Sequence, residues 1–427
     1  MNSDIGTDMY KLAEELFPIC RSLTGSGVRE TLQILKKYLP GLKKFEIPTG
    51  TQCFDWTIPK EWNIRSGYIA NLRGERLVDF KNNNLHVVGY STPISTRIKF
   101  KDLQKHLHTI PSMPTAIPYI TSYYSENWGF CLPHSLMETM RDEEYDIHID
   151  SSLEHGHLTY SELVIPGRIE KEIFISTYIC HPSMANNEIS GPVLATFLAK
   201  YILQLDRKYS YRIIFIPETI GAVAYLSTNK DALKKNVYAG FQLTCVGDNR
   251  NYSYLPSRTQ NTITDKIMKH ALKHKVPSFK TYTFLDRGSD ERQYCAPGID
   301  LPVASIMRSK YGQYPEYHTS LDDLSLVSSQ GFQGSFNIHK ECIDLLENNE
   351  KYKATQLCEP QLGKRGLRSN VGSLTSLTPS FKEISDVLAY ADGEMDLLDL
   401  AETLGVYALD LLPTIHLLLE HSLLIKN

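Results

Sequence analysis

Polar residues of the metal-binding type follow three apolar runs of the sequence. His181 comes directly after EIFISTYIC, Glu218 follows YRIIFIP, and Asp290 lies in the polar turn GSDERQY. A second histidine, His318, follows IDLPVASIM by a loop, in PEYHTSLDDL. Two neutral imidazoles and a carboxylate suit Zn²⁺, and a further carboxylate can act as general base toward a metal-activated water. If the apolar runs are neighbouring strands, the pattern predicts a site for metal-assisted hydrolysis.

The segments that carry these residues alternate between strand and helix patterns. Apolar runs such as EIFISTYI and YRIIFIPE alternate with amphipathic stretches such as GPVLATFLAKYILQL and TITDKIMKHALKHK. This alternation predicts a largely parallel sheet with helices on both faces. Ligands gather at the carboxyl ends of the strands in such a sheet. All four residues are therefore expected on one rim.

The α/β pattern covers only part of the chain. Two helical patterns, DMYKLAEELF and VRETLQILKKYL, precede it. Between them and the α/β pattern, residues 47–159 contain short strand-like pieces separated by Pro and Gly turns, which predicts a mostly β module. We therefore expect a discontinuous core formed by residues 1–46 and 160–350, with the β module inserted into it.

The C-terminal part predicts a separate module behind a linker. Residues 351–380 are rich in Gly and Ser, as linkers are. Residues 381–427 show three helical patterns with Gly393 and Gly405 at the breaks and a short strand at the end. This order is typical of a winged-helix or helix-turn-helix module.

The charge of this module disfavours DNA as its partner. Between residues 381 and 427, two lysines stand against nine acidic residues. A DNA-binding helix needs Lys and Arg to neutralise phosphates, and the candidate recognition helix ALDLLPTIHLLLEHS contains neither. We expect the module to contact a protein partner or a second copy of the chain.

Global composition indicates a soluble globular protein. The 427 residues carry a formal charge of -4 and are 42% hydrophobic, which gives no general attraction for nucleic acid or an acidic membrane. The N-terminus lacks the basic start and apolar run of a signal peptide, and no stretch approaches the roughly 18 apolar residues of a membrane span. The 8 cysteines show no CxxC spacing and are expected to be reduced thiols. A cytoplasmic protein without membrane contact is predicted.

Several motifs resemble known families. HPSMANNEISG, PETIG and YHTSLDDL resemble the co-catalytic zinc aminopeptidases of the M28 type. With ELFPICRSLTGSGVRETL and GSDERQYCAPG added, the chain resembles more closely a bacterial family of aminopeptidase-like proteins, over nearly its entire length. Members of that family are often labelled as polysaccharide-biosynthesis proteins. The resemblance implies a zinc-aminopeptidase-like α/β core with a mainly parallel or mixed sheet, an inserted mostly-β domain and a C-terminal winged helix-turn-helix.

The resemblance also implies roles for individual residues. His181 and His318 match the first and last metal histidines of the aminopeptidases, and Glu218 matches their general base. These three residues keep the types that metal binding and catalysis require. They are the core of the implied hydrolytic site.

Three other ligand positions of the family are altered here. Asn187, Thr219 and Thr244 stand where the aminopeptidases have carboxylates. Two dications without an anionic bridge repel each other strongly at any plausible dielectric constant. One zinc ion is therefore expected in preference to two, with Asn187 or a carboxylate such as Asp290 or Glu188 completing its ligands.

Four residues are candidates for substrate contacts. Asp290 could receive a substrate's ammonium group if it is not a metal ligand. Arg292 and Arg308 could bind an anionic group. Tyr317, beside His318, could donate a hydrogen bond to a developing oxyanion.

Three functional hypotheses remain open at this point. One is a mononuclear hydrolase of amide or peptide bonds, acting on a small peptide or on an aminoacylated or N-acylated sugar in surface-polysaccharide metabolism. In the second, the metal is purely structural. In the third, the chain binds no metal and is a binding or scaffold protein that keeps the peptidase fold without its chemistry.

Overall fold

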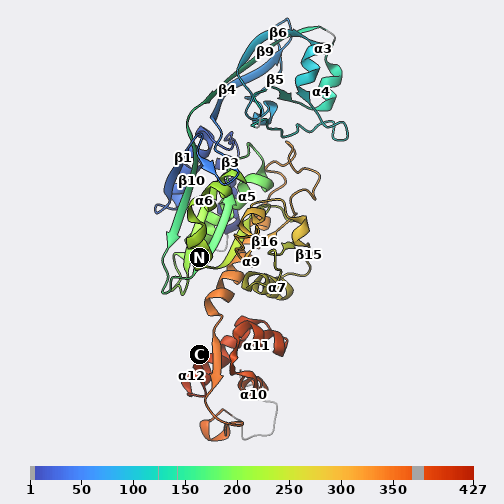
Figure 1. The fold of residues 1–427 in the computed structure, drawn as a ribbon. Coiled ribbons are helices and arrows are strands. Elements are labelled where there is room, and N and C mark those ends of the chain that lie inside the picture. Colours follow the sequence, from blue (N-terminus) through green and yellow to red (C-terminus); the bar gives the residue numbers. More distant parts are fainter. Residues whose placement is uncertain (1–4, 124, 142, 368–378) are drawn as a thin grey trace. The chain divides into compact units, whose positions relative to one another are not determined.

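A computed structural model describes residues 5–123, 125–141, 143–367 and 379–427, which divide into two compact units (Figure 1). The larger unit comprises Met1–Thr264 and Phe279–Asn337. The smaller unit comprises Asp265–Ser278 and Ile338–Asn427. A segment from the middle of the chain therefore belongs to the same unit as the C-terminal part.

The larger unit is built on a mixed sheet of eight strands in the order β1-β10-β12-β11-β13-β16-β14-β15. The strands are β1 (Lys43–Pro48), β10 (His157–Ile165), β11 (Glu172–Tyr178), β12 (Ser210–Ile216), β13 (Val237–Leu243), β14 (Ser253–Leu255), β15 (Lys280–Thr281) and β16 (Val303–Met307). The central strands β12, β11, β13 and β16 run parallel. Antiparallel pairing occurs on both flanks, between β1, β10 and β12 and between β14 and β16. The predicted mixed sheet is confirmed.

Burial explains why the parallel strands read as continuous apolar runs. All residues of β11 are buried, because strands covered on both faces have no solvent side. The helices of the larger unit include α1 (Ile5–Leu16), α2 (Ser26–Tyr38), α5 (Ser190–Ile202), α6 (Ile220–Asn236) and α8 (Glu291–Tyr294). Helix α5 packs against β11, β13 and α1, and only Lys200 of its residues is exposed.

The inserted segment forms its own four-stranded sheet in the order β5-β4-β9-β6. Its elements are β2 (Gln52–Cys53), β3 (Trp56–Thr57), β4 (Glu61–Ala70), β5 (Arg76–Asp79), β6 (Ile94–Lys99), α3 (Phe100–Leu103), β7 (Leu107–His108), β8 (Phe130–Cys131), α4 (His134–Thr139) and β9 (Glu144–Glu154). A separate apolar cluster that includes Ile69, Phe130 and Ile147 supports this sheet. Strand β9 leads directly into β10 of the main sheet (Figure 1).

The smaller unit contains three helices and a three-stranded sheet in its C-terminal part, the arrangement of a winged helix-turn-helix. Its elements include α7 (Ile263–Lys275) and the end of α9 (Ser329–Asn348), followed by β17 (Lys351–Ala354), α10 (Phe381–Tyr390), β18 (Asp392–Asp396), α11 (Leu397–Leu404), α12 (Leu412–Glu420) and β19 (Leu424–Lys426). Gly405 ends α11 with a φ of 72°, as a glycine after a helix commonly does. Over the described ranges, no single helix is long and apolar enough to cross a membrane. Leu397–Leu404 and Ala408–Glu420 meet that test only as a pair bent by 99°.

The start of the predicted linker is a strand instead. Lys351–Ala354 forms β17, which pairs with both β18 and β19. The alternating sequence KYKA buries Tyr352 on one side of this strand while its lysines remain exposed. The linker prediction rested on the Gly- and Ser-rich composition of the whole segment, and this composition does not reveal a strand of four residues at its start. Residues 368–378 of the predicted linker lie outside the described part of the chain.

Candidate active site

Three neighbouring strands deliver polar residues to one rim of the main sheet. His181 follows β11, Glu218 follows β12 and Thr244 follows β13. Because β11 lies between the other two strands, His181 stands in the middle of the rim. Its Nε2 is 3.9 Å from Oε2 of Glu218. His181 and Glu218, two of the four residues expected on one rim, lie at the ends of neighbouring parallel strands.

The other ring nitrogen of His181 is held by a buried ion pair. Nδ1 of His181 lies 3.0 Å from Oε2 of Glu188, and Oε1 of Glu188 lies 3.2 Å from Nε of Arg21. The Arg21 Nε also donates to the carbonyl oxygen of His181 at 3.0 Å. The side chains of Arg21 and Glu188 are fully buried. A proton on Nδ1 that is donated to Glu188 leaves the Nε2 lone pair directed toward Glu218, the arrangement that metal-binding histidines use.

This geometry bears on two candidate ligands near His181. Glu188, considered above as an alternative ligand, is engaged with Arg21 and His181. Cys180 forms a geometric group with His181 and Glu188 that could hold a metal ion. However, burial raises the pKa of the Cys180 thiol well above its ordinary value, and its sulfur accepts the backbone N–H of Glu218 at 3.1 Å. Glu188 therefore holds the His181 ring through Nδ1, and Cys180 holds the backbone N–H of Glu218.

The second histidine reaches the same place through a strained loop. The ring centroid of His318 is 5.3 Å from that of His181, and its φ of 57° lies in the left-handed region that disfavours non-glycine residues. Burial, together with the charge of His181, lowers the pKa of His318 to about 3. The imidazole is thus neutral at physiological pH, the form that binds a metal ion.

Tyr119, from the inserted module, lies against both histidines. The ring of Tyr119 lies 5.1 Å from His181 and 5.2 Å from His318, measured between centroids. Its backbone N–H donates to the carbonyl oxygen of His318 at 2.9 Å. The insert therefore contributes directly to the site and helps to hold the strained residue in place.

Asn187 occupies a turn of π-helix, Ala185–Ile189, that leads into α5. Asp322 accepts the backbone N–H of Asn186 at 2.6 Å and that of Asn187 at 2.9 Å. Nδ2 of Asn187 donates to the hydroxyl of Tyr178 at 2.8 Å. Its Oδ1 is buried and has no hydrogen-bond partner among the described residues.

Thr244, the third altered ligand position, belongs to the same hydrogen-bond network. The hydroxyl groups of Tyr178 and Thr244 are 2.6 Å apart, and the Tyr178 hydroxyl also donates to the backbone carbonyl of Asn187 at 2.9 Å. Tyrosine, threonine and asparagine therefore form a neutral network here, at two of the three positions where the resemblance implies altered ligands. It contains no anion that could bridge two dications.

Asp290 lies beside the candidate base, directly before the short helix α8. Its Oδ1 accepts the backbone N–H of Thr219 at 2.7 Å, whereas its buried Oδ2 has no partner among the described residues. This contact holds Thr219 at a φ of 61°. Burial raises the pKa of Glu218, and burial together with the charge of Glu218 raises that of Asp290 well above its ordinary value. A partly buried carboxylate, Glu218, next to a fully buried one, Asp290, both with raised pKa values, is suited to proton transfer.

The candidate substrate residues separate into two groups. Arg292 is exposed and donates to the Thr219 hydroxyl at 2.5 Å. Its positive charge favours the ionised form of Glu218 and so opposes the rise in the pKa of that carboxyl group. The ring of Tyr317 stacks on His318 with centroids 4.0 Å apart. Arg308 instead donates to Asn249 at 2.7 Å and stands over the ring of Tyr252. The structure therefore places Arg292 beside Thr219 and Glu218 and Tyr317 against His318, and gives Arg308 other partners.

A second group of residues whose side chains could bind a metal ion lies in the smaller unit. His270, His274 and Glu402 place one candidate ligand atom each within 4.8 Å of one another. Nδ1 of His270 lies 2.5 Å from Oε1 of Glu402, and its Nε2 accepts the backbone N–H of Ala408 at 3.0 Å. Both nitrogens of His270 are therefore engaged by protein groups, whereas Nε2 of His318 has no hydrogen-bond partner among the described residues.

Several residues that shape the site have roles that the sequence does not predict. Arg21 lies 160 residues from His181 along the chain, and Tyr119 comes from a module without an interpretable motif. Tyr178 is an ordinary strand tyrosine in the sequence. Arg21 and Asp322 lie in the motifs ELFPICRSLTGSGVRETL and YHTSLDDL, so the resemblance marks both positions without indicating what either side chain contacts.

Comparisons with known proteins agree with this geometry. A family model described as a domain of unknown function, DUF4910, matches residues 10–349, and a winged helix-turn-helix model matches residues 350–426. A Clostridium acetobutylicum protein, provisionally named as a polysaccharide biosynthesis protein with an aminopeptidase-like domain, is 45% identical over 424 residues, covering 98% of this chain and 97% of that protein. The predicted resemblance is confirmed.

Solved structures extend the comparison. A crystal structure from Clostridium acetobutylicum, provisionally described as a peptidase, superposes with a TM-score of 0.93 and 44% identity, covering 99% of this chain and 96% of that one. The zinc aminopeptidase BSAP of Bacillus subtilis gives a TM-score of 0.58 at 11% identity, covering 79% and 94%. A Shewanella amazonensis M28 peptidase precursor gives 0.56 at 13% identity, covering 83% and 97%. The last two matches establish an aminopeptidase-like fold.

Proposed function

The chain belongs to the DUF4910 family, with a winged helix-turn-helix behind that domain, and we propose that it hydrolyses an amide or peptide bond with one bound zinc ion. One observation carries this proposal. Nε2 of His181 points at the carboxylate of Glu218 across 3.9 Å, beside the neutral ring of His318.

The donor atoms on the rim fit one zinc ion. Nε2 of His318, Oδ1 of Asn187 and Oδ2 of Asp290 are buried without hydrogen-bond partners among the described residues. Unsatisfied buried polar atoms are costly and rare, so these three atoms are candidate ligands beside Nε2 of His181. Two imidazole nitrogens with one or two oxygens form a set that Zn²⁺ accepts. When bound, zinc would polarise the substrate carbonyl and acidify a water molecule.

The residues of this chain would provide proton transfer, substrate binding and stabilisation of the oxyanion. Glu218 is placed to take a proton from the attacking water and to give it to the leaving nitrogen, for which a raised pKa is suitable. Asp290 holds the Thr219 turn and, when not a ligand, can receive a substrate ammonium group. Arg292 offers an exposed cation next to Glu218 for an anionic substrate group. Tyr317 can donate to the oxyanion that forms on the carbonyl.

The substrate class follows from the chemistry and from the name of the relative. A small peptide, or an aminoacylated or N-acylated sugar, presents an amide bond together with polar groups. The relative's name links that protein to polysaccharide biosynthesis, and we extend this association to the present chain as part of the proposal.

The test combines zinc-loaded wild-type protein with the Glu218→Gln variant. We expect the wild type to release amine from at least one member of a panel of aminoacyl p-nitroanilides and aminoacylated or N-acetylated sugars. Glu218→Gln should lower kcat by at least about 100-fold, the usual contribution of a general base, without loss of bound zinc. Equal turnover in wild type and variant would contradict the role of Glu218.

A second candidate function has its own support. The network of Tyr178, Thr244 and Asn187 satisfies most of its polar groups without any metal ion. These internal hydrogen bonds favour a scaffold or binding protein that keeps the aminopeptidase-like fold and does not catalyse hydrolysis. Absence of turnover over the whole panel, combined with absence of zinc binding, would select this alternative.

A further inference from the structure

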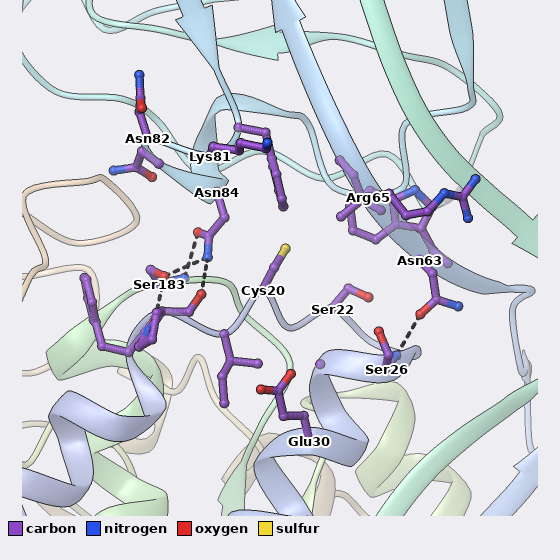
Figure 2. Close-up of a pocket in the computed structure, with 18 of the residues that line it drawn as sticks. Cys20, Ser22, Ser26, Glu30, Asn63, Arg65, Lys81, Asn82, Asn84 and Ser183 are labelled. Atoms are coloured by element: carbon purple, nitrogen blue, oxygen red, sulfur yellow. Dashed lines mark hydrogen bonds between the residues drawn. The ribbon is translucent and has the colours of Figure 1, made fainter.

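A cavity of about 530 Å³ lies where the inserted module meets the N-terminal helices (Figure 2). Its walls come from the turn between α1 and α2, the first turn of α2, the beginning of β4 and the loop after β5. Ser183, from the loop that carries His181, contributes to the wall as well. The volume lies within the range of small-molecule binding sites.

The polar groups of this cavity offer both donors and acceptors without a strong net charge. Within the described residues, the side chains of Glu30, Lys81 and Asn82 form no hydrogen bond or ion pair, and Figure 2 shows them around the cavity. The Arg65 guanidinium is neutralised by Asp150, to which its Nε donates at 2.8 Å. One carboxylate, one ammonium and one amide therefore remain to bind a ligand.

Two asparagines of the wall are fixed by hydrogen bonds. Asn84 donates to the Ser183 hydroxyl at 2.7 Å and accepts the Ser183 backbone N–H at 3.1 Å. Asn63 accepts the backbone N–H of Ser26 at 2.7 Å (Figure 2). The cavity is thus held open by contacts between the core and the insert, and a ligand would find it formed in advance.

Partly exposed apolar side chains complete the lining. Phe17, Ile64 and Phe80 line the cavity and are neither fully buried nor fully exposed. Apolar and aromatic surfaces of this kind can cover the C–H face of a sugar ring, while hydroxyl groups at its edge pair with amide, carboxylate and ammonium groups.

Other ligand classes fit less well. A phosphate or nucleotide would need several free cations, whereas the lining includes one lysine that is unpaired among the described residues, Lys81, together with the carboxylate of Glu30. The α2 N-terminus is no substitute, because its first N–H is taken by Asn63, and Glu30, farther along the same helix, also lines the cavity. An apolar ligand would leave the amides and hydroxyls without partners.

The cavity is separate from the histidines of the candidate active site. A much smaller cavity of about 10 Å³, lined in part by Arg21, Tyr119 and Pro182, adjoins it on that side. That volume holds about one water molecule. A ligand in the large cavity therefore does not reach His181 by this route.

We propose that this cavity is a binding site for a neutral saccharide, distinct from the hydrolytic site. Glu30 and Asn82 bind its hydroxyl groups, Lys81 donates to a ring or hydroxyl oxygen, and Phe17 and Phe80 contact its apolar face. The proposal does not rest on the hydrolytic function, because none of these residues belongs to the candidate active site.

The experiment titrates the full-length protein with glucose, maltose, N-acetylglucosamine and its β-1,4 dimer. Intrinsic fluorescence reports binding because Trp62 lines the cavity, and saturation-transfer NMR provides a second readout. We expect saturable binding of at least one saccharide. Glu30→Ala and Asn82→Ala should each weaken it at least fivefold, whereas Glu14→Ala, an exposed glutamate of α1 outside the cavity, should leave it unchanged.

Three outcomes would overturn the proposal. These are no saturable binding of any of the four saccharides, binding that is insensitive to both cavity variants, and inorganic phosphate or triglycine competing for the same site with higher affinity. Glu218→Gln should bind the saccharide as the wild type does. Failure of the hydrolytic function and failure of this proposal are therefore distinguished by separate measurements.

Discussion

At the scale of single residues, the buried Arg21 determines which nitrogen of His181 faces the rim. Its guanidinium holds both the carbonyl oxygen of His181 and the carboxylate of Glu188, which in turn takes Nδ1 of the imidazole. A buried pair of this kind is energetically sensitive to the loss of either partner. The effect of the Arg21–Glu188 pair on the free energy of unfolding can be measured separately from its effect on zinc binding.

Glu188→Gln tests this chain of contacts. Removing the charge leaves Arg21 buried without its counterion, which should lower the free energy of unfolding by about 3–5 kcal/mol. Replacing the carboxylate that faces Nδ1 by a neutral amide should also weaken zinc binding by about 10–100-fold. Urea denaturation and competition with a zinc chelator measure the two effects.

The matched control is Glu126→Gln. Glu126 forms an exposed pair with Lys60, and exposed pairs contribute less than about 1 kcal/mol. A Glu188→Gln variant that is as stable as this control would contradict the importance of the buried pair.

The sequence predicted the residues that sit at strand ends and missed those that act through tertiary contacts. His181, Glu218 and His318 could be predicted because a polar residue after an apolar strand stands out, and because the order of the motifs matches a family. Arg21 and Tyr119 could not, since their roles arise only when the α1–α2 turn and the insert fold against the rim. Arg308 was assigned to substrate from its residue type alone, which does not reveal its partners.

At the scale of elements, Glu61 joins three parts of the larger unit. It begins β4 and pairs with Arg29 of α2, whose Nη1 donates to Oε2 at 3.1 Å. It also accepts the backbone N–H of His157 at the start of β10 and the side chain of Asn63, both at 3.1 Å. Burial opposes its ionisation, but these hydrogen bonds outweigh burial and lower the pKa of Glu61 to about 2.

This lowered pKa predicts an acid-dependent contribution to stability. A carboxylate whose pKa is lower in the folded state stabilises the fold above its unfolded pKa, 4.5, and loses that contribution as the pH falls toward about 2. The free energy of unfolding of the wild type should therefore exceed that of Glu61→Gln at pH 6, and the difference should shrink between pH 4.5 and 3. A difference that stays constant over this range would contradict the assignment.

At the scale of the whole molecule, the composition of the C-terminal module governs its choice of partner. Residues 381–427 carry two lysines and nine acidic residues, so the winged helix-turn-helix lacks the cations that neutralise DNA phosphates. We propose that it contacts a protein partner or a second copy of this chain.

Fluorescence anisotropy with labelled double-stranded DNA checks this prediction. We expect no saturable binding by the full-length chain at about 0.15 M salt, where phosphate contacts still support DNA binding by basic modules. Submicromolar affinity that falls steeply with added salt would contradict it. Sedimentation of the DNA-free protein over a range of concentrations tests self-association separately.

If His181 and His318 hold one zinc ion, elemental analysis of the purified, zinc-supplied protein should detect that ion. The smaller unit contains a second group of zinc-ligand types, so the measurement compares wild type, His181→Ala/His318→Ala and His274→Ala. We predict about one zinc ion per chain in the wild type and in His274→Ala, and none in the double variant. Zinc that persists in the double variant, or no zinc in any of the three proteins, would contradict the claim.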